Sequence, residues 1–173
     1  MATPTTLPAT FVSGNTLLAS QMNALRGAFR VLQVVQSTKS DFFSTTSTSY
    51  IDITGLSVAI TPSATSSKIL VCVTVQASAG GGGDGIYRLV RDATAVGVGT
   101  AGTGYNGIAM AASSYQNQIF TIGLNFLDSP ATTSATTYKL QVLSNTGTSY
   151  VNRRGVGDSY GGFSSITVME ISA

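Results

Sequence analysis

Two overlapping copies of a phosphate-binding spacing occur in the segment GVGTAGTGYNG, residues 97–107. The pattern G-x-G-x-x-G is met twice, on Gly97, Gly99 and Gly102 and again on Gly102, Gly104 and Gly107. In dinucleotide-binding folds such glycines let the backbone approach a pyrophosphate, and an acidic residue about 20 positions later binds a ribose hydroxyl. Asp128 meets that last condition. The chemistry also needs a strand before the glycines and a long helix after them.

The surroundings of the glycines do not meet those needs. Residues 108–117, IAMAASSYQN, supply at most one short helix, and no second β-α-β pattern follows. Overlapping matches also arise by chance wherever a segment is dense in glycine. We therefore expect residues 97–107 to form a loop at a strand end or subunit contact, with Tyr105 its most informative side chain, and to hold no nucleotide cofactor.

Catalytic and metal-binding constellations are poorly supported. The chain has no histidine, which excludes a Ser-His-Asp triad and an imidazole metal site, and no S-x-x-K precedes any lysine. Asp128 and Asp158 could meet as a glycosidase pair, and Asp84 and Asp92 could bind calcium, but isolated carboxylates favour turn or edge positions. We expect a protein that is not an enzyme, with no catalytic residue, metal or cofactor.

Composition narrows the partners. Charged residues are 9% of the 173, against about 25% in ordinary soluble proteins, and the net charge is +2. Arg153-Arg154 is the one adjacent pair of cations, so no basic stripe exists to bind nucleic acid. No segment approaches the ~20 apolar residues of a membrane span, and no signal peptide is evident. We expect a soluble, unexported chain that binds neither nucleic acid nor membrane.

The first 30 residues differ from the rest and are predicted to form an anchoring arm with one short helix. Residues 1–15 carry Pro4 and Pro8 without periodicity, which favours an extended arm. LLASQMNALRGAF then spaces apolar residues by four, three and four, with Ser20 a candidate N-cap. The stripe of this helix must pack on its own domain or on copies of itself. The expected anchoring or oligomer contacts are Phe11, Leu18, Met22, Leu25 and Phe29.

From residue 31 to residue 173 short alternating runs predict a single all-β domain. The expected strands are 31–36, 41–45, 50–53, 56–61, 68–77, 85–92, 118–127, 137–144, 148–152 and 164–171. Turns are expected at Thr54-Gly55, Thr61-Pro62-Ser63 and Asn145-Thr146-Gly147, a hairpin tip at Gly80–Gly83, and a buried Cys72. Many short strands without interleaved helices predict a jelly-roll β-sandwich.

Five tyrosines lie in or beside segments rich in glycine, serine and asparagine: Tyr87, Tyr105, Tyr115, Tyr150 and Tyr160. Rigid amphipathic rings among adaptable polar groups are typical of recognition surfaces. A β-sandwich also keeps tyrosines at sheet edges with the hydroxyl in water. These five are candidate surface-recognition residues, with the sheet-edge role as the alternative.

The sequence resembles a domain common in virion proteins of tailed phages over about residues 31–173. The segments that carry the resemblance are LQVVQSTKSDFFSTTSTSYIDITGLSVAITPSATSSKILVCVTV, IFTIGLNFLDSPATTSATTYKLQV, YVNRR and SSITVMEI. FVSGNTLLASQMNALRGAF is similar to the N-terminal lead of phage appendage proteins. That domain is similar in strand plan to the trimeric C1q and TNF-like jelly rolls.

The resemblance implies a non-enzymatic virion component. It implies a homotrimeric tail fibre or spike subunit, attached to other virion proteins through residues 1–30 and displaying a jelly roll for adsorption to the host surface, with a surface glycan as a candidate receptor. A capsid decoration protein that stabilises the head is one alternative. A carbohydrate-binding module is the other.

Overall fold

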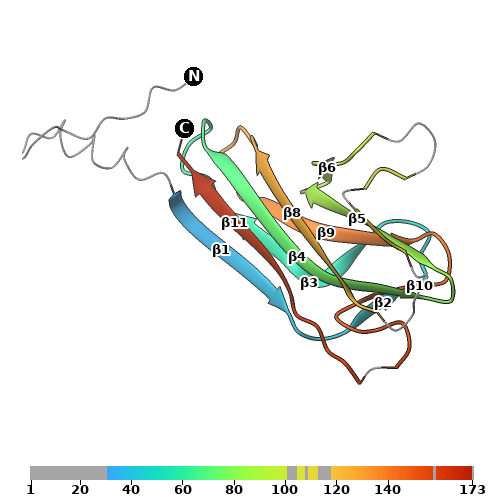
Figure 1. Cartoon of the computed structure of the whole chain (residues 1–173). Coiled ribbons are helices and arrows are strands. Elements are labelled where there is room, and N and C mark those ends of the chain that lie inside the picture. The colour runs from blue at the N-terminus through green and yellow to red at the C-terminus, as the bar shows by residue number, and fades with distance from the viewer. Residues whose placement is uncertain (1–30, 101–104, 108, 113–117, 158, 173) are drawn as a thin grey trace, which may run out of the picture.

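A computed structural model describes residues 31–100, 105–107, 109–112, 118–157 and 159–172 (Figure 1). None of these residues is helical, and they form two antiparallel sheets. The strands are β1 (Val31–Lys39), β2 (Phe43–Thr45), β3 (Ile51–Ile60), β4 (Lys68–Gly80), β5 (Asp84–Arg91), β6 (Thr94–Val96), β7 (Ala109–Ala112), β8 (Phe120–Asp128), β9 (Thr136–Ser144), β10 (Thr148–Val151) and β11 (Ser164–Ile171). The helix expected before residue 30 and the five anchoring residues lie outside this part of the chain.

The six-stranded sheet, here sheet A, is organised around the long strand β4. One edge of β4 pairs with β11 through Lys68–Thr74 and then with β10 through Ala77–Gly80. Its other edge pairs with β8. Outside these, β1 pairs with β11 and β2 with β10. Because β4 runs the length of the sheet, its two ends mark the two ends of sheet A.

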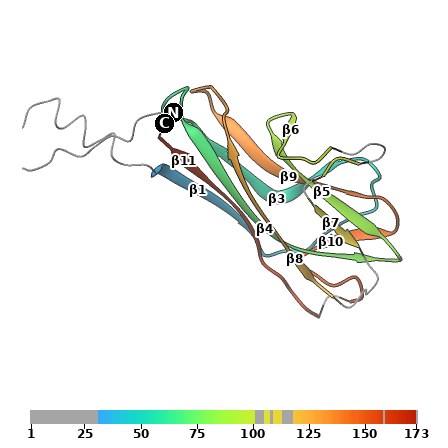
Figure 2. The same cartoon turned by 45° about the horizontal axis from the view of Figure 1, so that its top comes forward.

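The five-stranded sheet, here sheet B, has the order β3-β9-β5, with β6 and β7 both on the far edge of β5. The strands pass repeatedly between the layers, since β3, β5 and β9 belong to sheet B while β4, β8 and β11 belong to sheet A (Figures 1 and 2). The first strand, β1, pairs with the last, β11. This is the winding of a jelly roll, and it confirms the all-β sandwich predicted from the alternating pattern.

The core lies between the sheets and is built from the residues that alternate inward. From sheet A come Val71, Val73 and Val75, and from sheet B come Tyr138, Leu140 and Val142, all at most 3% exposed. β-branched and aromatic side chains suit this pleated, buried surface. The alternation in the sequence therefore identified the inward faces of β4 and β9 correctly.

One predicted turn and one predicted loop need correction. Thr54-Gly55 does not separate two strands: β3 continues through it with a register shift between Asp52 and Ser57, and Gly55 has φ +89°. A bulge of this kind adds residues without ending the strand. No strand was expected between residues 92 and 118, yet residues 94–96 form β6 and residues 109–112 form β7.

The glycine run after β4 is a crossing between sheets, not the tip of a hairpin. β4 belongs to sheet A and β5 to sheet B, so the two strands flanking Gly81–Gly83 do not pair. The turn at Asn145–Gly147 crosses back beside it: a Cβ added at Gly83 would overlap the carbonyl oxygen of Thr146, and one added at Gly147 would overlap that of Gly80. The glycines are required here because two crossings pack backbone to backbone.

Candidate functional site

The segment that carries the double glycine pattern forms no phosphate cradle among its described residues. It follows β6, a strand of three residues, and is followed by the antiparallel β7. Gly97 has φ +62°, and a Cβ there would lie 2.8 Å from the Phe126 ring. At the other end, the Tyr50 hydroxyl donates to the Asn106 carbonyl, and Tyr105 is 45% exposed. Gly97 lies at a strand end, as predicted, and serves close packing rather than ligand approach.

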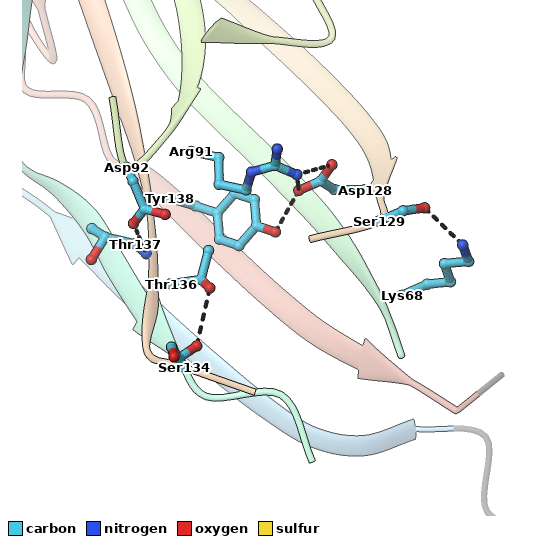
Figure 3. A network of polar contacts seen from close by, with 9 residues as sticks. All are labelled: Lys68, Arg91, Asp92, Asp128, Ser129, Ser134, Thr136, Thr137 and Tyr138. Atoms are coloured by element: carbon cyan, nitrogen blue, oxygen red, sulfur yellow. Dashed lines mark hydrogen bonds and ion pairs between the residues drawn. The ribbon is translucent and has the colours of Figure 1, made fainter. Parts of the chain in front are cut away.

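Asp128 is committed to a structural network that joins the sheets (Figure 3). Its carboxylate, at the end of β8 in sheet A, accepts hydrogen bonds from Arg91 Nη1 at 2.7 and 2.8 Å and from the Tyr138 hydroxyl at 2.7 Å. Both donors belong to sheet B. The hydrogen bond with Asp128 raises the pKa of Arg91, and burial, with this carboxylate, raises the pKa of Tyr138.

Of the two carboxylates considered for calcium, Asp84 begins β5, where its backbone carbonyl accepts from the Asn145 amide. Asp92 accepts a 2.8 Å hydrogen bond from the Thr137 amide, which makes it a turn carboxylate. Asp158, the other half of the expected glycosidase pair, lies outside the described residues. No group of three or more His, Cys, Asp or Glu in the described part of the chain could hold a metal ion.

The five candidate recognition tyrosines differ in their exposure to solvent. Tyr87 is fully buried in the core, so its assignment to a recognition surface is wrong: it pairs with Val142 on an inward row of sheet B. Burial also raises its pKa. Tyr150 is half-buried, and Tyr160 is 58% exposed. Tyr115 lies outside the described residues.

The described part contains no helix, and so none that could span a membrane.

The outer face of sheet B is polar and internally paired. Lys139 Nζ lies 2.8 Å from Asp52 Oδ2, and Gln141 donates to the other oxygen of the same carboxylate. Arg88 donates to Gln141 and stacks over the Tyr50 ring, with its Cζ 3.8 Å from the centroid. Charges that already have partners suit a face that remains in water.

The outer face of sheet A carries a row of large apolar side chains across four strands. We call these residues the apolar row: Val34, Met169, Leu70 and Leu127, each paired with the next by register. Their strand neighbours Val71 and Val168 lie in the core, so the row points outward. Val34 and Leu127, at its two ends, are 55% and 57% exposed.

The apolar row lies at the end of the sheet where the described chain begins. Val31 and Leu32, at the start of β1, are also exposed, and Val31 pairs with Ile171 near the other terminus. The next row along the face is uncharged and contains Cys72, which is half-buried on this outer face and not in the core as expected. Contiguous apolar surface of this kind marks interaction sites in soluble proteins.

At the other end of β4, two arginines lie over aromatic rings, of which those of Phe42 and Tyr160 are exposed. Arg153 Cζ lies 4.8 Å from the centroid of Tyr150 and 5.8 Å from that of Phe42, and Arg154 Cζ lies 4.0 Å from that of Tyr160. These distances are within cation–π range. We call the five residues the arginine–aromatic cluster. Since Leu70 and Ser78, the partner of Tyr150, are eight residues apart on β4, roughly 26 Å separates the cluster from the apolar row.

Neither surface was identified as such from the sequence, although each left a trace there. In VLQVV and KILVCV the alternation is interrupted by adjacent apolar residues, which place one inward and one outward. Arg153-Arg154 stood out as the one adjacent pair of cations. The apolar row is assembled by strand pairing between segments more than 30 positions apart. In the arginine–aromatic cluster only Phe42 is distant in sequence, since the other four residues lie within residues 150–160.

Comparison with known proteins assigns no family. No family model matches the sequence, and no curated protein matches it. A solved structure titled as infectious bursal disease virus, Gx strain, is similar with a TM-score of 0.37 and 16% sequence identity. The match covers 80% of this chain and 41% of that one, so this chain spans about two fifths of the length of that viral protein chain.

Proposed function

We propose that this chain is a non-enzymatic structural subunit of a phage virion. In this proposal it is a homotrimeric tail fibre or spike subunit, joined to other virion proteins through residues 1–30. The sandwich is then presented outward for adsorption to the host surface. The resemblance of residues 31–173 to phage virion domains suggests this assignment, and the all-β sandwich is compatible with it.

The observation that carries the proposal is that the two ends of sheet A carry different surfaces. The apolar row lies beside Val31, where residues 1–30 join the domain, and the arginine–aromatic cluster lies at the opposite end of β4. A subunit that is held at one end and recognises a ligand at the other needs this division. Many such sites on one particle would give avidity even if each binds weakly.

Self-association is supported by the contrast between the two outer faces. Sheet B offers paired charges, whereas the two rows of sheet A that follow the apolar row are built from glutamine, threonine, serine, asparagine, cysteine and glycine. The described strand residues place a single charge on that face, Lys68 at its end. An apolar, charge-depleted surface is typical of the buried part of subunit interfaces.

The non-enzymatic part of the proposal is supported by the hydrogen bonds of the Asp128 carboxylate. A general acid must be able to exchange a proton with a substrate, and this carboxylate accepts three hydrogen bonds inside the sandwich. Release of sugar from a host polysaccharide, abolished by Asp128→Asn or Asp158→Asn, would overturn the non-enzymatic assignment.

Sedimentation of the purified chain tests the trimer. We expect a trimer at micromolar concentration, dissociated by Val34→Lys or Leu127→Lys because a charge in the apolar row would be buried without a partner. Ala59→Lys is the matched control, since it adds the same charge at an exposed position on the outer face of sheet B, away from the proposed interface. A monomer at this concentration, with and without residues 1–30, would refute the trimer.

Two alternatives each have an observation in their favour. Attachment beside an apolar row would also suit a capsid decoration protein, whose arm would lie across shell subunits. The exposed rings of the arginine–aromatic cluster would suit a carbohydrate-binding module. Immunogold labelling of particles separates tail from head, and absence of label from particles would favour the module.

A further inference from the structure

We propose that the arginine–aromatic cluster, Phe42, Tyr150, Arg153, Arg154 and Tyr160, binds acidic polysaccharide. This inference rests on the proposed adsorption function and names the class of ligand that the distal end would take. The shared chemistry is a sugar ring that carries an anionic oxygen group, either a carboxylate or a phosphate.

The guanidinium groups of the cluster are oriented for an anion. Arg154 Cζ lies over the Tyr160 ring, and Arg153 Cζ lies over those of Tyr150 and Phe42. Arg153 Nε donates to the Arg154 carbonyl at 3.3 Å, and the other N–H groups of the two side chains have no acceptor among the described residues. A planar guanidinium donates in pairs to carboxylate or phosphate oxygens. Among the described residues neither arginine has an ion-pair partner, and Arg154 Nε is buried without an acceptor.

The nearby charges leave the two arginines dominant. Asp41, next to Phe42, is the described carboxylate closest in sequence to the cluster, and its Oδ2 lies 2.8 Å from Lys39 Nζ. That pair is internally neutral, and the hydrogen bond from Lys39 lowers the pKa of Asp41. Asp158, between Arg154 and Tyr160 in the sequence, lies outside the described residues, and with its charge counted the segment 153–160 still has two arginines against one carboxylate. Net positive charge beside apolar rings favours a ligand with an anion on a partly apolar ring rather than a simple ion.

The rings supply the second part of the recognition. Phe42 is 41% exposed and Tyr160 is 58% exposed, and Phe163, three residues later in the sequence, is 55% exposed. Exposed aromatic faces release water when a flat, partly apolar group covers them. The C–H face of a sugar ring is such a group, whereas an acidic peptide without rings would use the guanidinium groups alone.

A buried asparagine holds the segments of the cluster together. The Asn152 side-chain amide donates to the Lys39 carbonyl at 2.8 Å and to the Asp41 carbonyl at 3.1 Å, and its oxygen accepts from Ser164 Oγ at 2.6 Å. Its backbone has φ +64°, a conformation that asparagine tolerates better than most residues. The residues just before Phe42 and just before Arg153 are thus fixed before any ligand arrives, which lowers the entropic cost of binding.

The test is binding of the full-length protein to immobilised polymers of defined chemistry. The acidic glycans are polygalacturonate, which carries carboxylates, and phosphomannan, which carries phosphates. Dextran is the neutral glycan and polyglutamate is the polyanion without sugar. We expect binding to at least one acidic glycan and to neither control polymer, and the glycan that binds identifies the anion.

Variants separate a built site from net charge. Arg154→Gln and Tyr160→Ala should each weaken binding at least fivefold. Tyr160 is exposed and Arg154 is half-buried, so the urea unfolding midpoint of each variant is measured to show that the fold is kept. Arg88→Gln is the matched control, because Arg88 also stacks on a tyrosine, Tyr50, but on sheet B. It should bind within twofold of the parent.

Three results would overturn the inference: no binding to either acidic glycan, equal binding to polyglutamate, or equal losses in Arg154→Gln and Arg88→Gln. The proposed function fails separately, because sedimentation and particle labelling measure trimer and location without any glycan. A monomer that still binds polygalacturonate through Tyr160 would keep the inference and lose the trimer.

Discussion

The hydroxyl of Tyr138 donates a 2.7 Å hydrogen bond to Asp128, and this bond crosses from one sheet of the sandwich to the other. The same carboxylate accepts from Arg91, so one residue of β8 fixes the ends of β5 and β9. Tyr138 and Asp128 are both buried, and a buried charge of this kind is tolerated only because all its partners are present.

Substitution of Tyr138 and substitution of Asp128 should therefore lower the free energy of unfolding by different amounts. Tyr138→Phe removes one hydrogen bond and leaves the ion pair, at a cost of about 1 kcal/mol in the free energy of unfolding. Asp128→Ala leaves the Tyr138 hydroxyl buried and Arg91 unpaired, at a cost of about 2–3 kcal/mol. Urea unfolding midpoints of the two variants measure the difference, and equal losses would contradict the proposed order.

Acid should destabilise the protein through Glu170. Burial alone would raise the pKa of this carboxyl, but hydrogen bonds from Ser63, Ser67 and Gln33 lower it to about 2 from 4.5. In this window the unfolded state binds the proton more readily, so the contribution of Glu170 to stability is present above about pH 4.5 and is lost as the pH falls toward 2.

Unfolding midpoints between pH 7 and pH 2.5 measure this effect. Glu170→Gln should be less stable than the parent at pH 7, by about 1–3 kcal/mol, and should lose less on acidification. Ser67→Ala removes one of the donors, at 2.7 Å, and should show an intermediate slope. Parallel curves for all three proteins would assign the acid sensitivity to other carboxylates.

The glycine pattern offers a test within one motif. Gly97→Ala forces a side chain into φ +62° and places its Cβ 2.8 Å from the Phe126 ring, and we expect a loss of about 2 kcal/mol. Gly99→Ala should cost much less, because the nearest atom to its Cβ is 3.7 Å away.

A double mutant identifies the cause of the Gly97 effect. In a Phe126→Leu background the same glycine change should cost less, since the smaller side chain leaves room. Additive losses in thermal or urea unfolding would show that backbone strain alone is responsible.

The single cysteine reports on the outer face of sheet A. Cys72 is half-buried there, two residues along β4 from Leu70 of the apolar row. If this face is buried between subunits, the subunits must separate before a thiol reagent can reach Cys72. The reaction should then be at least about tenfold slower in the parent than in Val34→Lys at equal protein concentration. Equal rates would place the subunit contact elsewhere.

The strands were largely predictable because alternation is a local property. β11 has the predicted bounds, residues 164–171, and the inward rows of β4 and β9 follow from the spacing of valine, leucine and tyrosine. β6 and β7 were missed because three or four residues, rich in alanine, carry too little pattern. Thr54-Gly55 resembles a turn but is a bulge, since cross-strand pairing with β9 continues on both sides of it.

Tyr87 and Tyr160 show that local sequence patterns do not predict whether a tyrosine is buried or exposed. Each lies near glycines in the sequence, yet Tyr87 is in the core and Tyr160 is 58% exposed. The difference is decided by register: Tyr87 pairs with Val142 on an inward row, whereas Tyr160 follows the end of β10 in a connection to β11.

By itself, the sequence determined the all-β class, the alternating inward faces and the lack of histidine chemistry, because each depends on residue type or on neighbours two positions apart. Only the tertiary structure decided that Val34, Met169, Leu70 and Leu127 share one row and that Arg153 stacks on both Tyr150 and Phe42. The physical reason is that a strand's own residues set which face a side chain takes, whereas its neighbours on that face come from long-range pairing.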